Sequence, residues 1–437
     1  MSSRQSWVFT PLIFGLLFVT LSFAEGTDPN EDFRVAWLKQ HAIPLRSIEP
    51  NDEDFSDLEP LLKVLRDVRI VQLGEQSHGD GATFYCKTRL IKFLHQKLGF
   101  DVLAFESGLY DCRKAWELLR GGMEPYEAFS HGVYYIWARS EQCRPLIDYW
   151  GRAAKSNEPL ELCGFDCKFS ARTSRDLVVK DVGAVLDKLG PAASNAEQHA
   201  AIMKILHKLT NWQRPTMLES QQGDNALAAW RKSLETARPS NSLTESELAF
   251  WRQFVASTSI LIERESLANQ ENEEESWMLR DKQMARNLLW LARTVYPQRK
   301  VIVWAGSPHL MHNPPPKWRV KWGLKTTMGH EVWKVLGKET YTVAFTSAEG
   351  EANAWHWEKA WQLEPPPPGS LEDLFVRAGC TNAFVDFRGL GPDGAWLKQK
   401  LITRLVMYPW GEDNCTDMFD GIVFIKKMFG STQRRNN

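Results

Sequence analysis

Short apolar runs alternate with segments of helical periodicity along most of the chain. Each run is bounded by turn residues, and the segments between the runs place apolar residues at the spacing of an amphipathic helix. Runs that are apolar without alternation are typical of parallel strands covered on both faces. The predicted strands are the run that ends before Gly74, then 102–105, 160–165, 300–304, 341–346, 383–387 and 422–425.

The segment 173–294 departs from this alternation, because it has long helical patterns and polar breaks but no convincing strand. Strands alternate with helices before it, which favours a sheet with helices on both faces. We therefore predict an α/β fold: a mostly parallel sheet flanked by helices, with a large helical insertion. The predicted parts are a signal peptide at 1–24, the first part of an α/β catalytic domain at 25–172, a helical subdomain at 173–295 and the second part of the catalytic domain at 296–437.

The first residues have the three parts of a secretory signal peptide. Arg4 supplies the positive charge, residues 8–23 are mostly apolar, and the small residues Ser22 and Ala24 suit cleavage after Ala24. An uncleaved anchor is the alternative, but the apolar run is short for a membrane span and contains proline and glycine. We expect a secreted or periplasmic protein with no stable membrane span in its mature chain.

Charge and cysteine content narrow the classes of partner. The chain has 53 basic and 54 acidic residues, a net charge of −1, and no run of lysine and arginine, which argues against a nucleic-acid partner. Export permits disulfides, and the seven cysteines are an odd number, so at least one thiol would be free or paired between chains. Disulfide connectivity and oligomeric state do not follow from the sequence.

Ionisable residues follow three of the predicted strands. Glu75 and His78 follow the first strand, Glu106 follows the second, and His309 lies just after the strand at 300–304. The carboxyl ends of parallel strands meet at one edge of a sheet, where ligands bind in open α/β folds. Histidine can act there as a general base, and a carboxylate can orient it or activate water. We therefore predict a catalytic site, with helix capping by these polar turns as the structural alternative.

Other chemistries find less support in the sequence. Glu75, His78, Glu106 and His309 could offer nitrogen and oxygen ligands to a metal ion, but there is no His-Glu-x-x-His motif and no dense ligand cluster. A serine nucleophile would be expected in a Gly-x-Ser-x-Gly motif, which the sequence lacks. A phosphate-binding site would be expected in a glycine-rich loop, and the sequence lacks that motif as well. We therefore expect no cofactor.

Several motifs resemble those of the erythromycin esterase family. They occur in the family's order over most of the chain, from the first predicted strand to the last. The matching residues are Gly74, Glu75, Ser77, His78 and Gly79 of the first motif, Lys87 and Arg89 in the next helix, Phe105 and Glu106, Gly164 and Asp166, Arg280 and Asp281 at the start of a helix, and the runs 327–329, 344–346 and 349–350.

The resemblance implies a hydrolase that adds water to an ester, such as the lactone of a macrolide. It implies that His78 is the general base, that carboxylates orient or assist it, and that water attacks the ester carbonyl directly, without a covalent enzyme intermediate. A cationic side chain such as Lys87 or Arg89 would then steady the developing oxyanion. The expected catalytic residues are His78, Glu75, Glu106 and His309. The expected substrate-binding residues are Lys87, Arg89, His312 and Asp166.

One position departs from the family's pattern. Where the family has Trp-Ala-His-Asn-x-His, this chain has Gly306 in place of the first histidine and retains the second as His309. His309 and His312 restore the histidine spacing three residues later, and the glycine enlarges the expected pocket. Three classes of function stay open: a hydrolase of a small-molecule ester, a binding protein that has lost catalysis, and a metal-dependent hydrolase or peptidase.

Overall fold

A computed structural model describes residues 29–190, 195–269, 272–316 and 325–434 of the 437. The predicted signal peptide, 1–24, lies outside the described residues. None of the helices within the described part of the chain is long and apolar enough to cross a membrane.

The central feature is a sheet in the order β1-β8-β11-β6-β2-β5-β3-β4, with β7 paired to β6. The six strands from β11 to β4 run parallel to one another. At the other edge, β8 pairs antiparallel with β11, and β1 pairs antiparallel with β8. The predicted α/β fold with a mostly parallel sheet is confirmed. The strands are β1 Ile43–Pro44, β2 Ile70–Leu73, β3 Phe100–Gly108, β4 Glu161–Asp166, β5 Lys300–Trp304, β6 Thr340–Ala352, β7 Trp361–Gln362, β8 Asn382–Asp386 and β11 Gly421–Met428, with β9 Lys400–Thr403 and β10 Gly411–Asn414 in a separate antiparallel pair.

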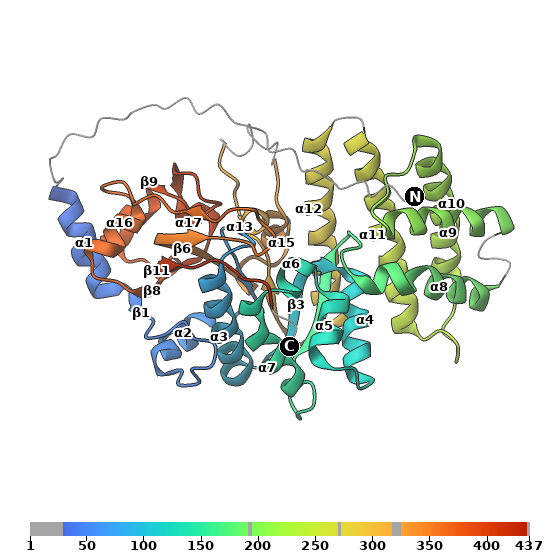
Figure 1. Ribbon diagram of the computed structural model, residues 1–437, viewed down its shortest axis with the longest axis horizontal. Coiled ribbons are helices and arrows are strands. Elements are labelled where there is room, and N and C mark those ends of the chain that lie inside the picture. Colours follow the sequence, from blue (N-terminus) through green and yellow to red (C-terminus); the bar gives the residue numbers. More distant parts are fainter. Residues whose placement is uncertain (1–28, 191–194, 270–271, 317–324, 435–437) are drawn as a thin grey trace.

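Helices fill the connections between these strands (Figure 1). Because parallel strands must be joined by crossovers, most of the long helices lie between consecutive strands of the sheet. The helices are α1 Pro29–His41, α2 Glu59–Leu65, α3 Gly81–Leu98, α4 Leu109–Arg120, α5 Pro125–Gly132, α6 Tyr135–Ala138, α7 Arg144–Ala153, α8 Arg172–Leu189, α9 Ala196–Thr210, α10 Met217–Thr236, α11 Glu245–Asn269, α12 Glu273–Trp290, α13 Ser307–Leu310, α15 Met328–Leu336, α16 Leu371–Arg377 and α17 Cys415–Met418.

The sheet separates two hydrophobic cores. Along β5, Val301 and Val303 point into one core, and Ile302 and Trp304 point into the other, as the period of two along a strand requires. Helices α8 to α12, α15 and α16 contribute to the first core, and α2, α3, α5 and α7 to the second. Full burial of each such side chain contributes about 1.5–3 kcal/mol. This explains why the strands appear in the sequence as continuous apolar runs.

Helices α8 to α12 form a group at one end of the molecule, drawn in green to yellow in Figure 1. They lie between β4 and β5 in the sequence, where a helical insertion was predicted. Their core is continuous with that of the sheet: Tyr110 of α4 packs against Trp251 and Phe254 of α11. The insertion therefore supports the sheet directly, and its helix α12 reaches the edge strand β4.

Strand β3 extends beyond the predicted segment 102–105, through an irregularity in register between Phe105 and Gly108. Strand β4 comes very close there, because a Cβ on Gly164 would lie 2.4 Å from the carbonyl oxygen of Gly108. Only glycine fits this approach. The close packing draws the polar residues at the ends of β3 and β4 together.

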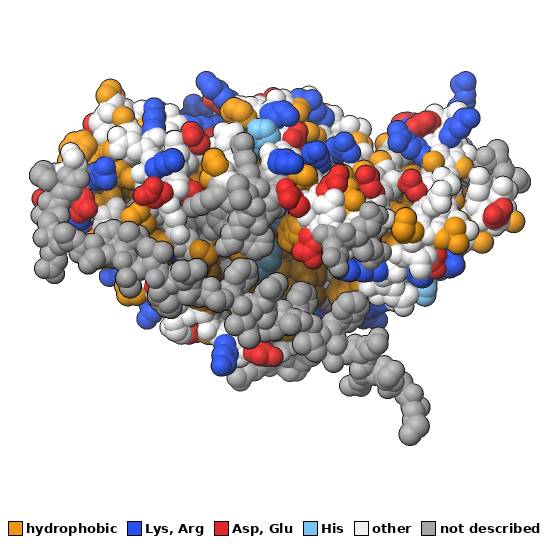
Figure 2. All heavy atoms as spheres, turned by 90° about the horizontal axis from the view of Figure 1, so that it is seen from above, with side chains coloured by type: hydrophobic (Ala, Val, Ile, Leu, Met, Phe, Trp, Pro, Cys, Tyr) orange, Lys and Arg blue, Asp and Glu red, His pale blue; other side chains and the backbone are white. Residues whose placement is uncertain are grey.

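No disulfide joins the seven cysteines, which all lie in the described part of the chain, and all but Cys380 are buried. Burial raises the pKa of Cys86 to about 12, which makes it an unreactive core residue rather than a nucleophile. On the face shown in Figure 2, acidic and basic side chains are interspersed and form no large area of one sign.

Candidate functional site

The carboxyl ends of β2, β5, β3 and β4 lie side by side and bring polar residues from separate parts of the chain to one edge of the sheet. A cavity of about 400 Å³ opens there. Three of the four expected catalytic residues, Glu75, His78 and His309, line it. The other lining residues are Gln76, Ser77, Tyr134, Ile136, Gly306, Pro308, His356, Trp357, Trp361, Met407, Tyr408 and Pro409.

Glu75 is fully buried and holds His78 in place. Its Oε1 accepts hydrogen bonds from His78 Nδ1 at 2.7 Å and from Trp137 Nε1 at 3.0 Å. Its Oε2 accepts from Lys87 Nζ at 2.7 Å. The ammonium of Lys87 also lies 4.0 Å from the centre of the Trp304 ring, a favourable cation–π contact. These partners compensate the buried charge of Glu75 and fix its orientation.

His78 reaches from this buried pair into the cavity. Its side chain is 38% exposed, and its ring lies edge-on to the indole of Trp137 with centroids 5.0 Å apart. A carboxylate only accepts hydrogen bonds, so the bond to Glu75 requires a proton on Nδ1 and leaves Nε2 as the basic nitrogen. Nε2 has no hydrogen-bond partner among the described residues. His78 is therefore arranged as an oriented base that can reach solvent.

Helix capping by the polar turn is the structural alternative to a catalytic role, but Ser77 of the turn that carries His78 does not cap helix α3. Helix α3 begins at Gly81 after Asp80, and the Ser77 hydroxyl accepts a bond from Gly79 N at 3.1 Å. Asp80 Oδ2 accepts from Ser77 N at 2.8 Å, and Tyr408 donates to Oδ1. Burial raises the pKa of Asp80 to about 7. The turn is thus held by its own buried carboxyl group.

A second polar cluster surrounds Arg280, a buried residue of α12. Its guanidinium donates to Glu106 Oε1 at 2.7 Å and to Asp166 Oδ2 at 2.6 Å, which ties the ends of β3 and β4 together. His309 Nε2 lies 3.2 Å from Glu106 Oε1, and His309 Nδ1 bonds to Asp281 Oδ1 at 2.6 Å. Arg280 Nη1 lies 3.1 Å from His309 Nε2. Two cations are therefore shared by three buried carboxylates.

This cluster shifts the pKa values of its members in opposite directions. Burial alone would raise the pKa of Glu106, but the charges of His309 and Arg280 outweigh it and hold that pKa well below its usual range. Burial alone would lower the pKa of His309, but Asp281 and Glu106 outweigh it and raise that pKa to about 10. His309 is thus a charged structural partner near neutral pH and a poor general base.

The raised pKa of His309 makes the stability of the fold depend on pH. The stability that the charged His309 ring contributes to the fold is complete below pH 6.5, the ordinary pKa of histidine. This stability is lost as the pH rises through the raised pKa of about 10. Between pH 7 and pH 10, the free energy of unfolding should therefore fall more in the wild-type protein than in His309→Gln. Urea unfolding of both proteins at the two pH values measures this. Equal losses in the two proteins would contradict the charged state of His309.

Gly306 lies between the two polar clusters. Its N–H donates to Glu106 Oε2 at 3.0 Å. A Cβ at this position would lie 3.3 Å from His78 Cε1 and 3.7 Å from Glu106 Oε2. A side chain here would therefore stand directly between His78 and Glu106, and the glycine leaves that space to the cavity.

The structure corrects the predicted roles of four residues: Lys87, Arg89, His312 and Asp166. Lys87 is completely buried behind Glu75, so it cannot reach an oxyanion in the cavity. Arg89 lies elsewhere: its guanidinium is held by Asp57 and by backbone carbonyls, including that of Ser47. His312 does not fill the space at Gly306. The corrections share one cause, since each side chain is held by a buried polar partner and not by the cavity.

For His312 that partner is Thr342, whose Oγ1 lies 2.9 Å from Nε2, and its ring is stacked on Trp333. Asp166, expected to bind substrate, bonds to Arg280 and does not line the cavity. Sequence reasoning did not place Trp137 and His356 in the site, because each comes from a connection without a recognisable motif. From the sequence, Arg280 is identified only as part of a segment that matches the family.

The four residues considered as metal ligands fall into two separate groups, Glu75 with His78 and Glu106 with His309. Each carboxylate is already bonded to N–H donors. In the part of the chain that the structure describes, no three histidine, cysteine, aspartate or glutamate side chains converge to hold a metal ion.

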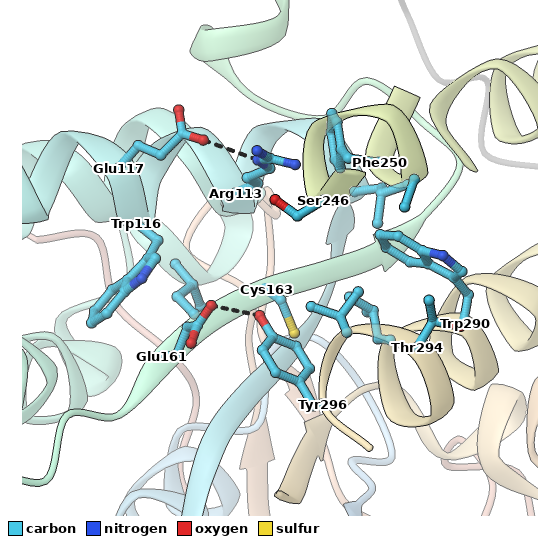
Figure 3. Close-up of a pocket in the computed structure, with 15 residues that line it drawn as sticks. Arg113, Trp116, Glu117, Glu161, Cys163, Ser246, Phe250, Trp290, Thr294 and Tyr296 are labelled. Atoms are coloured by element: carbon cyan, nitrogen blue, oxygen red, sulfur yellow. Dashed lines mark hydrogen bonds and ion pairs between the residues drawn. The ribbon is translucent and has the colours of Figure 1, made fainter. Parts of the chain in front are cut away.

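A second cavity, of about 370 Å³, lies at the amino end of β4 and is shown in Figure 3. Four of its polar side chains are paired with each other: Tyr296 donates to Glu161 Oε1 at 2.7 Å, and Arg113 bonds to Glu117 at 2.9 Å. Strand β4 separates Glu161 from Asp166 by five residues, about 17 Å at 3.3 Å per residue. This cavity is therefore remote from the two histidines and from the polar edge of the sheet.

Comparisons with known proteins agree on one family. The sequence profile of the family described as erythromycin esterase matches residues 95–428. YbfO of Bacillus subtilis (strain 168) is 30% identical over 397 residues, which cover 86% of each chain. Erythromycin esterase type II of Escherichia coli is 24% identical over 388 residues, 82% of this chain and 89% of that protein.

Solved structures share the fold. A crystal structure of a Bacillus cereus protein has a TM-score of 0.76 at 18% identity and covers 93% of this chain and 100% of its own. An erythromycin esterase mutant in its open conformation has a TM-score of 0.64 at 14% identity, with 87% and 96% covered. The expected family resemblance is confirmed by the family profile and the two relatives.

Proposed function

This chain belongs to the erythromycin esterase family of hydrolases, and on that basis we propose that it hydrolyses a carboxylic ester with His78 as the general base. The observation that carries the proposal is the Glu75–His78 pair: one ring nitrogen is fixed by a buried carboxylate, and the other is left without a partner in the cavity. This is the arrangement that base catalysis by histidine requires.

The proposed reaction needs no covalent intermediate. A water molecule gives a proton to Nε2 of His78 as its oxygen bonds to the acyl carbon of the ester. The resulting tetrahedral intermediate breaks its bond to the alkoxide oxygen, which takes the proton back from the imidazolium. The products are a carboxylic acid and an alcohol. Glu75, which accepts hydrogen bonds from Lys87, Trp137 and His78, stabilises the imidazolium as it forms.

Glu106 and His309 support this reaction through the backbone at Gly306, which lines the cavity. Glu106 orients the backbone at Gly306 through its bond to the amide N–H, and Arg280 and His309 keep Glu106 in place. The network fixes the part of the cavity lining at Gly306, so a bound ester meets a preorganised surface there.

The cavity favours an uncharged, bulky substrate. No lysine or arginine is among its lining residues, and its apolar members include Trp357, Trp361 and Met407. These three side chains are 39%, 57% and 37% exposed, so they offer apolar surface at the mouth of the cavity. A small-molecule ester, including a macrolide-like lactone, fits this chemistry.

Turnover of a set of matched substrates tests the proposal. The purified protein should hydrolyse at least one uncharged ester among a macrolide lactone, alkyl esters and aryl esters, and should leave the matched amides intact. Product acid and alcohol are measured by mass spectrometry. Hydrolysis of none of these esters, together with tight binding of one, would instead support a binding protein, the alternative that the loss of a family histidine at Gly306 favours.

We also propose that the protein acts outside the cytoplasm. The support is the charged, apolar and small-residue pattern of residues 1–24. Expression of the full chain followed by sequencing of its new N-terminus should find Glu25. A protein that keeps its first residues and stays in the cytoplasmic fraction would contradict export.

A further inference from the structure

Among the described residues that line the cavity, no cation is free to stabilise the oxyanion that forms during ester hydrolysis, because the charged ring of His309 is already paired with Asp281 and Glu106. Lys87, expected in this role from the sequence, is buried behind Glu75, and Arg280 is used by Glu106 and Asp166. The backbone N–H of Gly306 is already bonded to Glu106. Since stabilisation of the oxyanion usually contributes more to the rate of such reactions than any other effect, another donor is needed.

His356 is a donor in the right place. It lies in the connection between β6 and β7 and lines the same cavity as His78. Its ring contacts the aromatic rings of Tyr135 and Trp355, with centroids 5.8 Å and 5.3 Å away. Neither ring nitrogen of His356 has a hydrogen-bond partner within the described ranges.

The backbone around His356 is anchored. Trp355 Nε1 donates to the carbonyl oxygen of Ile136 at 3.0 Å, which fastens the connection to α6. Trp357 N donates to the carbonyl oxygen of Ala354 at 2.7 Å and closes a turn around the histidine. The imidazole is therefore presented to the cavity from a fixed turn rather than from a free loop.

We infer that His356 is a further catalytic residue, which donates a hydrogen bond to the carbonyl oxygen of the ester as that oxygen becomes negative. The inference rests on the proposed ester hydrolysis and adds a second histidine to it. His78 takes the proton of water, and the N–H of His356 stabilises the oxyanion without giving up its own proton. When the intermediate collapses, the carbonyl re-forms and the hydrogen bond weakens again.

The charge state of His356 suits this role. Burial, together with the charge of His78, lowers its pKa, so its ring is neutral near pH 7 and carries one N–H. A neutral imidazole can polarise a carbonyl group, as one does in triosephosphate isomerase. It also avoids placing a second permanent cation beside the imidazolium of His78.

Two variants and a control test the inference on the ester that the wild-type protein hydrolyses best. His356→Ala should lower kcat by about 10²-fold, the lower end of the range for loss of an oxyanion donor, because water can partly replace an exposed imidazole. KM should change little. His356→Gln should recover part of the loss through its amide N–H. Lys359→Ala, an exposed neighbour on the same connection, should match the wild-type protein.

Inhibitor binding separates a catalytic role from a structural one. His356→Ala should bind a tetrahedral phosphonate analogue of that ester about 10²-fold more weakly and the matched non-hydrolysable amide as tightly as the wild-type protein does. Equal weakening of both ligands, or an unchanged kcat, would overturn the role of His356 while leaving the proposed function intact. If the wild-type protein hydrolyses no ester, the proposed function fails and the role of His356 fails with it.

Discussion

Replacing His78 with alanine should lower kcat for ester hydrolysis by about 10²–10⁴-fold, the usual contribution of a general base. The variant loses a ring that a buried carboxylate orients through Nδ1 and whose Nε2 has no hydrogen-bond partner among the described residues. The fold should survive, because the side chain is 38% exposed and Glu75 keeps its bonds to Lys87 and Trp137. Steady-state rates on the preferred ester measure the loss.

A matched control is His207→Ala. This histidine is exposed on α9, outside the site, and its replacement should leave kcat unchanged. Thermal unfolding of all three proteins should show that neither variant is unfolded at the assay temperature. An active His78→Ala protein, within about threefold of the wild-type kcat and so within about 0.7 kcal/mol in activation free energy, would exclude His78 as the base.

Replacing Arg280 with methionine should destabilise the fold by about 3–5 kcal/mol, the scale expected when one partner of a buried ion pair is removed. The guanidinium is the shared partner of Glu106 and Asp166, and both carboxylates are buried. Without it, two negative charges face each other at the ends of β3 and β4. Urea unfolding at pH 7 measures the loss of free energy.

The control for this prediction is an arginine in an exposed ion pair. Arg172 bonds to Asp176 at 2.9 Å on the surface of α8, with side chains 57% and 43% exposed. Arg172→Met should cost less than about 1 kcal/mol, because solvent screens such pairs. The Arg280→Met penalty should also shrink at low pH, where the two carboxyl groups take up protons. An Arg280→Met protein as stable as Arg172→Met would contradict the account of this cluster.

The central strands could be predicted because they are buried on both faces and therefore apolar throughout. Strand β5 was predicted with its observed limits, 300–304. The short edge elements could not be predicted, because strands such as β1 and β7 contain two residues each and have no periodicity. The antiparallel direction of β8 also depends on long-range pairing with β11, which leaves no local pattern.

The site was predictable as far as it follows from the ends of parallel strands. That rule brought Glu75, His78, Glu106 and His309 to one edge of the sheet. The position of the strand ends does not determine the direction in which a charged side chain on a helix points. For this reason the sequence predicts, wrongly, that Lys87 and Arg89 bind the substrate in the cavity. Both turn to buried carboxylates instead.

His356 could not be assigned from the sequence for a different reason. It lies in a connection rich in tryptophan, far along the chain from His78, and no motif relates the two. The hydrogen bond from Trp355 to the backbone of α6 and the turn closed by Trp357 bring the imidazole to the cavity. Sequence patterns therefore do not predict site residues whose positions depend on the tertiary contacts of a connecting segment.

The most direct test of the central claim, base-catalysed ester hydrolysis without a metal ion, is the initial rate of wild-type hydrolysis before and after exhaustive chelation, with metal content measured in the same samples. The account predicts an unchanged rate and less than one metal ion per chain. Loss of activity on chelation, restored by adding a stoichiometric metal ion, would contradict it and would assign the carboxylates and histidines of this edge to a metal instead.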